Sequence, residues 1–191
     1  MLSGVVRVRI ALIRHFPVKD AAGLCYGQLD LPLAHATRVA DIQPLRMALP
    51  GAVRVYSSPL SRCWQLAQLL DLAAQADDRL QELDFGRWEG RRWDEIGAMA
   101  LDEWIASGYA ATHGGEGLTD LQERVWQWAD ELAAAGQPEA IAITHAGVIR
   151  ALWSRTRAWD ACLAQPVPYG EIQWLDWPGT GQPGGPTTDY P

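Results

Sequence analysis

Two short apolar runs in this chain end in the same way, with a histidine. Residues 8–13 lead through Arg14 to His15, and residues 140–144 lead directly to His145. Such nearly continuous apolar runs are typical of strands that are covered on both faces of a parallel sheet. In an open α/β sheet, ligands bind outside the carboxyl ends of the strands. The two histidines are therefore predicted to share one site at that edge of the sheet.

The composition indicates one soluble globular domain. The chain has 191 residues, of which 48% are hydrophobic and 20% are charged, enough for a sizeable core. We expect the domain to occupy residues 1–177, and residues 178–191, which are rich in Pro and Gly, to form a disordered tail. The formal net charge of −7 excludes the broad basic surface that nucleic acid binding requires. A phosphate-bearing ligand must therefore meet local positive charge.

The three cysteines, Cys25, Cys63 and Cys162, are widely spaced and include no C-x-x-C pair. This pattern favours neither a disulfide framework nor a zinc site, and it fits a reducing compartment. Arginines interrupt the N-terminal apolar stretch, and no run is long enough to span a bilayer. We therefore expect a cytoplasmic protein that is not inserted in a membrane.

Alternating strand and helix signals predict an α/β fold. The predicted strands cover residues 5–13, 52–56, 140–144 and 171–177, and the first of them is expected to be central. Residues 76–90 carry no regular period and are predicted to be extended and irregular.

Helices are predicted between these strands. Ser58 is predicted to cap a helix in which Pro59 is the first helical residue. Thr119 and Gln122 are predicted to form a capping box ahead of a helix that Gly136 closes. Three further helices are predicted at residues 34–49, with a break or kink at Pro44, at 93–105 and at 147–157.

Arg62 falls in the first turn of the helix predicted after Pro59. The positive end of the helix dipole disfavours a cation there and favours an anion, and the planar fork of an arginine suits phosphate oxygens. Arg14, Arg62, His15 and His145 together therefore predict an oxyanion pocket.

A pocket of this kind lacks only a proton donor. The segment 80–90 offers three carboxylates, Glu82, Asp84 and Glu89. Chemistry alone does not choose among them.

Four segments of the chain appear in the order found in the histidine phosphatase superfamily, also called the phosphoglycerate mutase-like family. They are residues 12–15, 57–62, 80–90 and 144–147, and across them the chain resembles this family. The resemblance implies a single-domain, three-layer α/β/α sandwich with a mostly parallel central sheet. It also implies an enzyme that hydrolyses phosphomonoesters without a metal ion or another cofactor.

The same resemblance implies a role for each residue of the site. His15 is the nucleophile that accepts the phosphoryl group, and Arg14, Arg62 and His145 hold its oxygens. Glu82 is the acid-base residue, a choice that rests on the family alone. We expect neutral His15 to attack the phosphorus while protonated Glu82 gives its proton to the leaving group. The two arginines and a protonated His145 then stabilise the charge, so that no metal is required.

Two loops bear on the substrate. Residues 16–19 replace the Gly, Thr and Asn that usually follow the family's histidine, so the auxiliary phosphate contacts of that loop are not carried over. Residues 23–33 resemble the bacterial α-ribazole-5′-phosphate phosphatase branch, which implies that this phosphate ester of cobalamin biosynthesis is the substrate.

Other functions compete with this one. The alternatives are a broad-specificity small-metabolite phosphatase, a phosphoglycerate mutase and a non-catalytic phospholigand-binding module. In each of them the partner is a small phosphorylated metabolite rather than nucleic acid or a membrane, and the family also allows a homodimer.

Several conspicuous side chains have ordinary structural interpretations. His35 and His113 are predicted to lie at the surface or to cap a turn. Three neighbouring arginines are predicted to form a solvated face rather than a second anion site: Arg87, Arg91 and Arg92. Most tryptophans are expected in the core, although four could stack on a heteroaromatic ligand: Trp64, Trp88, Trp93 and Trp104.

Overall fold

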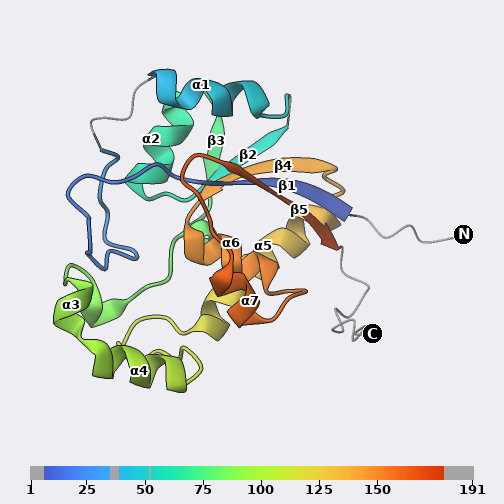
Figure 1. Ribbon diagram of the computed structural model, residues 1–191. Helices are drawn as coiled ribbons and strands as arrows, with labels where there is room; N and C mark the ends of the chain where they lie inside the picture. Colours follow the sequence, from blue (N-terminus) through green and yellow to red (C-terminus); the bar gives the residue numbers. More distant parts are fainter. Residues whose placement is uncertain (1–6, 35–38, 52, 179–191) are drawn as a thin grey trace, which may run out of the picture.

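The computed structural model describes residues 7–34, 39–51 and 53–178. Within them the chain forms a five-stranded sheet with helices on both faces (Figure 1). Apart from its first residue, the tail predicted at 178–191 lies outside the described residues, as does His35. Parts of the strands predicted at 5–13 and 52–56 and of the helix predicted at 34–49 also lie outside them.

The sheet has the strand order β3-β2-β4-β1-β5. Its strands are β1 (Arg7–Arg14), β2 (Arg54–Ser57), β3 (Ala74–Ala76), β4 (Glu139–Thr144) and β5 (Ile172–Pro178). The first four run parallel to one another, and β5 runs antiparallel to β1. This confirms the predicted α/β class and mostly parallel sheet. The middle strand is β4 rather than β1, and the sequence pattern does not predict β3, because three residues are too few to show a period.

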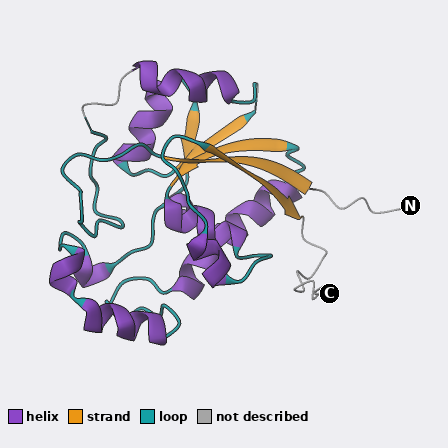
Figure 2. Ribbon diagram, viewed as in Figure 1, coloured by secondary structure: helices purple, strands orange, loops and turns teal. Residues whose placement is uncertain are grey.

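Helices cover both faces of the sheet (Figure 2). On one face lie α1 (Val39–Ala48) and α2 (Ser61–Leu69). On the other lie α5 (Leu118–Ala134) and α6 (Ala146–Trp153), with α7 (Trp159–Ala164) packed against α6. The three-layer α/β/α arrangement is thereby confirmed. No helix in the described part of the chain is long and apolar enough to cross a membrane.

The side chains of β1 show how the sheet serves two cores. Val8, Ile10 and Leu12 are fully buried in the apolar cluster that includes α5 and α6. Ala11 and Ile13 point to the opposite face and are fully buried in the cluster that includes α1 and α2. Because neighbouring side chains of a strand alternate between faces, a strand covered on both sides must be apolar at almost every position.

Several helix boundaries differ from the predicted ones. The helix predicted at 147–157 ends at Trp153, and the sequence pattern does not predict α7. α1 continues through Pro44, and Ile42 and Leu45 on either side of it are buried in the same core cluster.

The start of α5 also differs from the prediction. The helix begins at Leu118, so Thr119 lies within it and does not form a capping box with Gln122. Instead, the carboxylate of Asp120 accepts a hydrogen bond from the backbone N–H of Gly117 at 2.9 Å. The buried face of α5 has the expected helical spacing and contains Leu121, Val125, Trp128 and Leu132.

The helix predicted at 93–105 is divided in two. α3 (Trp93–Ile96) and α4 (Ala98–Ala106) meet at Gly97, whose φ of +86° is a left-handed value that ends one helix before the next begins. Both helices lie away from the three layers, on the side where β1 ends (Figure 1). Between β3 and α3 the chain forms two short 3₁₀ turns, η1 (Asp78–Leu80) and η2 (Gly86–Trp88).

The N-terminus of α2 is capped by a residue from a distant loop. Ser58 and Pro59 precede the helix, which begins at Ser61, so Ser58 is not its N-cap. The Asp30 carboxylate accepts hydrogen bonds from the Ser61 backbone N–H and hydroxyl, both at 2.7 Å. The anion at this helix end is therefore a carboxylate of the chain itself, and it fixes the turn that carries Arg62.

Replacing Asp30 tests this cap. We expect Asp30→Ala to lower the free energy of unfolding by about 1 kcal/mol, because a helix N–H loses its side-chain acceptor. Asp30→Asn keeps one acceptor oxygen and should lose less. Urea denaturation of the two variants and the wild type measures the difference, and equal stabilities of all three would show that Asp30 does not cap α2.

Candidate active site

The pairing of β1 with β4 brings His15 and His145 together. Arg14 lies opposite Thr144 in the parallel register, and the His15 backbone N–H donates to the Thr144 carbonyl at 3.1 Å. The two imidazole rings follow directly, with centroids 5.1 Å apart and planes inclined by 64°. Both side chains are buried at the carboxyl end of the sheet.

The hydrogen bonds of His15 define its tautomer. Its Nδ1 lies 2.6 Å from the carbonyl oxygen of Phe16, which can only accept, so Nδ1 carries the proton. Burial lowers the pKa of His15 to about 3, and the nearby charges of Arg62 and Arg14 contribute to the lowering. The ring is therefore neutral, and its lone pair is on Nε2, which is the state required of a nucleophile.

His145 is also neutral, which corrects the expectation of a protonated ring. Burial lowers its pKa well below the usual value, and His15 and Arg62 add to the effect. The Arg62 Nε donates to His145 Nδ1 at 3.3 Å, so the ring proton lies on Nε2, which is 2.9 Å from the Ser58 hydroxyl oxygen. Ser58, which the sequence suggests as a helix cap, thus orients this histidine.

The two arginines occupy different surroundings. Arg62 is completely buried and donates from Nη1 to the Leu29 carbonyl at 2.9 Å and from Nη2 to the Gly27 carbonyl at 2.5 Å. Arg14 donates from Nη1 to the Val167 carbonyl at 2.7 Å. Since a guanidinium has five N–H groups, each arginine keeps N–H groups beyond those bonded to these carbonyls.

A polar cleft of about 340 Å³ opens at this edge of the sheet. Its walls include Arg14, His15, Glu82, Tyr26 and Tyr169. The Arg14 guanidinium lies 3.6 Å from the centre of the Tyr169 ring, and the His15 ring centroid lies 5.9 Å from it. The two tyrosines are site residues that the sequence reasoning missed. Tyr26 lies within the loop at 23–33 that was singled out, whereas nothing in the sequence marks Tyr169.

Glu82 is held at the wall of this cleft by backbone donors. Its Oε2 accepts from the Gly147 N–H at 3.1 Å, and its Oε1 accepts from the Leu83 N–H at 3.0 Å. A Cβ atom on Gly147 would overlap Oε1, so a larger residue there would have to displace the Glu82 carboxyl. In the motif of residues 144–147, Gly147 thus has a structural role in addition to that of His145.

The other two carboxylates of the segment fasten loops. Asp84 accepts from the Gly86 N–H at 2.7 Å, and Glu89 accepts from the N–H groups of Gln28 and Phe85 at 2.7 and 3.0 Å. Of the three candidates, Glu82 is the one among the residues lining the cleft. The position of Glu82 therefore favours it as the acid-base candidate, and this position is not evident from the sequence.

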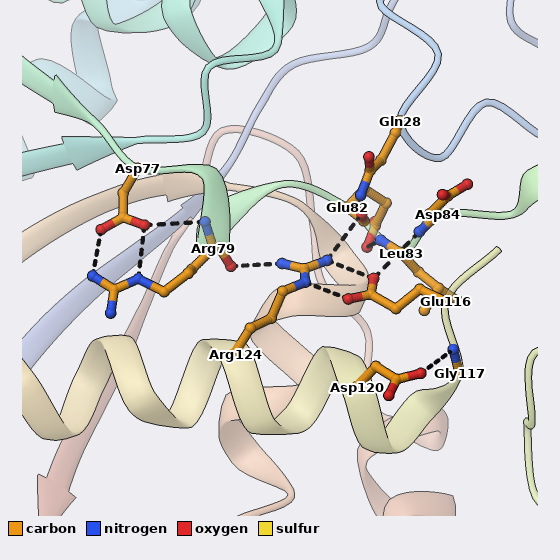
Figure 3. Close-up of polar contacts among 10 residues, drawn as sticks. All are labelled: Gln28, Asp77, Arg79, Glu82, Leu83, Asp84, Glu116, Gly117, Asp120 and Arg124. Carbon is orange, nitrogen blue, oxygen red and sulfur yellow. Dashed lines mark hydrogen bonds and ion pairs between the residues drawn. The ribbon is translucent and has the colours of Figure 1, made fainter.

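Arg124 of α5 fixes the backbone on which Glu82 lies (Figure 3). It donates from Nη2 to the Glu82 carbonyl at 3.1 Å and from Nη1 to the Arg79 carbonyl at 2.6 Å. Its Nε and Nη2 also form a two-pronged ion pair with Glu116 at 2.5 and 2.8 Å, and Glu116 accepts from the Asp84 N–H at 3.4 Å. These partners come from two segments outside α5, residues 79–84 and Glu116, so no local motif identifies the arrangement.

Of the two roles predicted for His113, a place at the surface is wrong, because the side chain is completely buried, whereas capping of a turn agrees with its contact to Gly115. Its ring lies among those of Phe85, Trp88 and Trp104, with centroids 4.9 to 5.8 Å away. Its Nδ1 accepts from the Gly115 N–H at 3.3 Å, and burial lowers its pKa. It therefore belongs to the packing of the loop beside the site.

The arginine cluster at 87–92 serves local structure. Arg87 donates to the Thr112 carbonyl, Arg91 donates to the Glu95 carbonyl at 2.9 Å, and Arg92 pairs with Asp94 at 3.2 Å. Among the residues that the structure describes, no three or more His, Cys, Asp or Glu side chains are grouped to hold a metal ion.

A neutral imidazole, an arginine and a carboxylate line one cleft at the carboxyl ends of parallel strands, and Arg62 is buried beside His145. This arrangement is suited to phosphoryl transfer. Residues 10–182 match the model of the histidine phosphatase superfamily (branch 1). The chain therefore belongs to this superfamily.

Two curated relatives cover most of the chain. Phosphoserine phosphatase 1 of Hydrogenobacter thermophilus is 24% identical over 157 residues, which cover 76% of this chain and 74% of that protein. Phosphoglycerate mutase-like protein 4 of Arabidopsis thaliana is 28% identical over 166 residues, which cover 78% and 70% respectively. The family and its phosphatase-named relative support an enzyme with phosphatase activity.

Solved structures share the fold. The phosphoglycerate mutase of Thermus thermophilus has a TM-score of 0.72 and 28% identity, and the match covers 90% of this chain and 94% of that one. A protein provisionally identified as an alpha-ribazole-5′-P phosphatase, from Escherichia coli, has a TM-score of 0.70 and 23% identity over 92% and 97% of the two chains. At that identity the second match shows the fold alone.

Gly147→Ala tests how closely α6 must approach Glu82. Alanine favours a helix over glycine by about 1 kcal/mol, yet here its methyl group must displace the Glu82 carboxyl. We expect kcat for an alkyl phosphate to fall roughly a hundredfold, as for a misplacement of about 1 Å in a catalytic group. Gly51→Ala is the matched control, because a Cβ there meets no atom within 4 Å. Unchanged kcat in Gly147→Ala would contradict the proposed position of Glu82.

The buried neutral histidines predict how stability depends on pH. His15 has a folded-state pKa of about 3 and an ordinary unfolded-state value of 6.5, so below pH 6.5 the unfolded chain binds a proton that the folded chain does not. Stability is thus lost as the pH falls from 6.5 toward 3, by up to about 1.4 kcal/mol per pH unit for each such histidine. We expect urea midpoints of His15→Gln to fall less steeply than those of the wild type over this range. If the urea midpoints of the two proteins fall equally steeply with pH, His15 titrates normally in the folded protein.

Proposed function

We propose that this enzyme hydrolyses phosphomonoesters through a phosphohistidine at His15, without a metal ion. The observation that carries the proposal is the state of His15, which donates from Nδ1 to the Phe16 carbonyl, has its lone pair on Nε2 and lines one cleft together with Glu82 and Arg14. In the first step Nε2 attacks the phosphorus, the bond from phosphorus to the leaving oxygen breaks, and Glu82 gives its proton to that oxygen.

The second step reverses the role of Glu82. As a carboxylate it takes a proton from water while the water oxygen attacks the phosphorus, and the bond from phosphorus to Nε2 breaks. Phosphate leaves, and His15 is again neutral. The remaining N–H groups of Arg14 and Arg62 would hold the equatorial oxygens, where charge gathers during phosphoryl transfer.

His145 has a supporting role in this scheme. Its ring is fixed between Arg62 and Ser58, in edge-on contact with His15. Through these contacts His145 would position Arg62 and His15 for the phosphate.

The favoured substrate is α-ribazole-5′-phosphate, which would place the enzyme in cobalamin biosynthesis. Two observations support this: the resemblance of residues 23–33 to that phosphatase branch, and the name given to the Escherichia coli protein of the same fold. The loop also has a structural part here, because the carbonyls of Gly27 and Leu29 bind Arg62. A broad-specificity small-metabolite phosphatase is the second candidate, favoured by the relative named as a phosphoserine phosphatase.

A substrate panel tests the proposal. Phosphate release is measured after chelator treatment for α-ribazole-5′-phosphate, 3-phosphoglycerate, simple sugar phosphates and an aryl phosphate. We expect the highest kcat/KM for α-ribazole-5′-phosphate. Similar low values across the panel would indicate a general phosphatase, and transfer of phosphate to the product alcohol would indicate a mutase. If no phosphate is released from any substrate but vanadate still binds, the protein is a non-catalytic phospholigand-binding module.

Glu82→Gln tests the proton donor by comparing leaving groups. We expect kcat for an alkyl phosphate to fall by roughly 10²–10⁴, whereas an activated aryl phosphate, whose leaving oxygen needs no proton, should lose much less in the first step. Asp84→Asn is the matched control and should affect both substrates alike. Burst kinetics isolate the first step, and equal losses in Glu82→Gln on both substrates would remove Glu82 from the donor role.

A further inference from the structure

The loop between α7 and β5 is fastened to the end of β1 beside the cleft. The Arg14 carbonyl accepts from the Gly170 N–H at 2.9 Å, and the Arg14 Nη1 donates to the Val167 carbonyl at 2.7 Å. The ring of Phe16 packs so closely on Gly170 that a Cβ there would overlap it. Gly170 also has a φ of +67°, a left-handed value that favours glycine. These contacts hold Tyr169, which lies between Val167 and Gly170 in the sequence, next to the site.

Tyr169 presents the face of its ring to Arg14. The guanidinium carbon lies 3.6 Å from the ring centroid, which is a van der Waals contact. A planar guanidinium stacks on an aromatic ring in this way without using its N–H groups, because these lie in the plane of the group. Tyr169 therefore covers one face of Arg14 and leaves its edge to an anion in the cleft.

The two arginines of the site are held by different means. Arg62 is completely buried and donates three hydrogen bonds, from Nε, Nη1 and Nη2, at 2.5 to 3.3 Å. Within the described part of the chain, the Arg14 side chain donates only the bond to Val167, and its buried Nε has no partner. Three hydrogen bonds fix the plane of a guanidinium, whereas one leaves the group able to rotate about that bond. The plane of Arg14 therefore depends on the ring of Tyr169.

We propose that Tyr169 is the positioning residue for Arg14: its ring fixes the plane of the guanidinium so that the remaining N–H groups meet the phosphate oxygens beside His15. The inference rests on the proposed function, because it takes Arg14 as a group that holds the phosphate. Tyr169 acts through Arg14, and the part that acts is the face of its ring rather than its hydroxyl.

Three substitutions separate the ring from the hydroxyl and from general packing. Tyr169→Phe keeps the ring and removes the hydroxyl, whereas Tyr169→Leu removes the ring. Trp174→Leu is the matched control, because Trp174 of β5 is 40% exposed, against 38% for Tyr169, and its ring also stacks on an arginine. That arginine is Arg9, whose guanidinium carbon lies 4.0 Å from the ring centroid, and neither Arg9 nor Trp174 lines the cleft.

Ethyl phosphate and vanadate report on the phosphate subsite, because neither carries a large group beyond its tetrahedral oxyanion. We expect Tyr169→Leu to lower kcat/KM for ethyl phosphate by roughly tenfold to a hundredfold, as for a misplaced catalytic group, and to weaken inhibition by vanadate. Tyr169→Phe and Trp174→Leu should stay close to the wild type in both measurements. An unchanged Tyr169→Leu, or an equal loss in Tyr169→Phe or in Trp174→Leu, would overturn the inference.

A double variant shows whether Tyr169 acts through Arg14. The rates are measured with an activated aryl phosphate, so that slow variants can be followed. Arg14→Ala removes the guanidinium and should lower kcat by roughly 10²–10³. In that background Tyr169→Leu should cause no further loss, because no guanidinium remains to be held. A further loss as large as in the wild-type background would mean that Tyr169 serves the fold or the substrate directly, and it would overturn the inference.

A binding measurement separates this inference from the proposed function. If no ester is hydrolysed, the proposed function fails, and the role of Tyr169 is then judged from calorimetric titration with vanadate. Binding that is weaker in Tyr169→Leu than in the wild type, Tyr169→Phe and Trp174→Leu supports the inference. Equal binding in all four proteins, or no binding in the wild type, overturns it.

Discussion

The site depends on the parallel pairing of β1 with β4. Both strands end at the same edge in a fixed register, with Arg14 opposite Thr144, so the next residue on each strand is a histidine at the rim of the sheet. A shift of one residue in this pairing would turn one ring to the opposite face. The register is held because both strands are buried on both faces, which leaves few alternatives for their side chains. Packing far from any substrate thus sets the 5.1 Å between the two rings.

Burial then decides the chemistry of these rings. An imidazole removed from water and surrounded by arginines loses its proton, and a backbone carbonyl selects which nitrogen keeps the remaining hydrogen. The cation that the pocket needs comes from arginines, whose charge persists when they are buried because their pKa is so high. Arg62 is completely buried and is bound to two carbonyls and to His145. The proposed nucleophile is therefore a neutral imidazole, and the positive charge of the pocket comes from arginines.

Local signals predict four of the five strands, the class of fold and part of the lining of the cleft, because apolar runs and short motifs are properties of neighbouring positions. Contacts between distant segments leave no such signal. Asp30 caps a helix that begins 31 residues later in the sequence, and Tyr169 reaches Arg14 from the loop before β5. Arg124 holds the backbone of Glu82 from α5. His113 is buried by aromatic rings that the sequence does not place beside it. Even the proton state of His145 depends on tertiary burial rather than on its position after a strand.

The central claim is that His15 carries the phosphoryl group, and trapping that group tests it most directly. In Glu82→Gln an activated aryl phosphate needs no proton for the first step, whereas water attack in the second step lacks its base, so the intermediate should accumulate. The reaction is quenched in alkaline denaturant, and the labelled peptide is identified by mass spectrometry. We expect one phosphoryl group on His15, stable in alkali, lost in acid and absent from the Glu82→Gln, His15→Ala double variant. A phosphoryl group on another residue, or turnover by His15→Ala close to that of the wild type, would contradict the account.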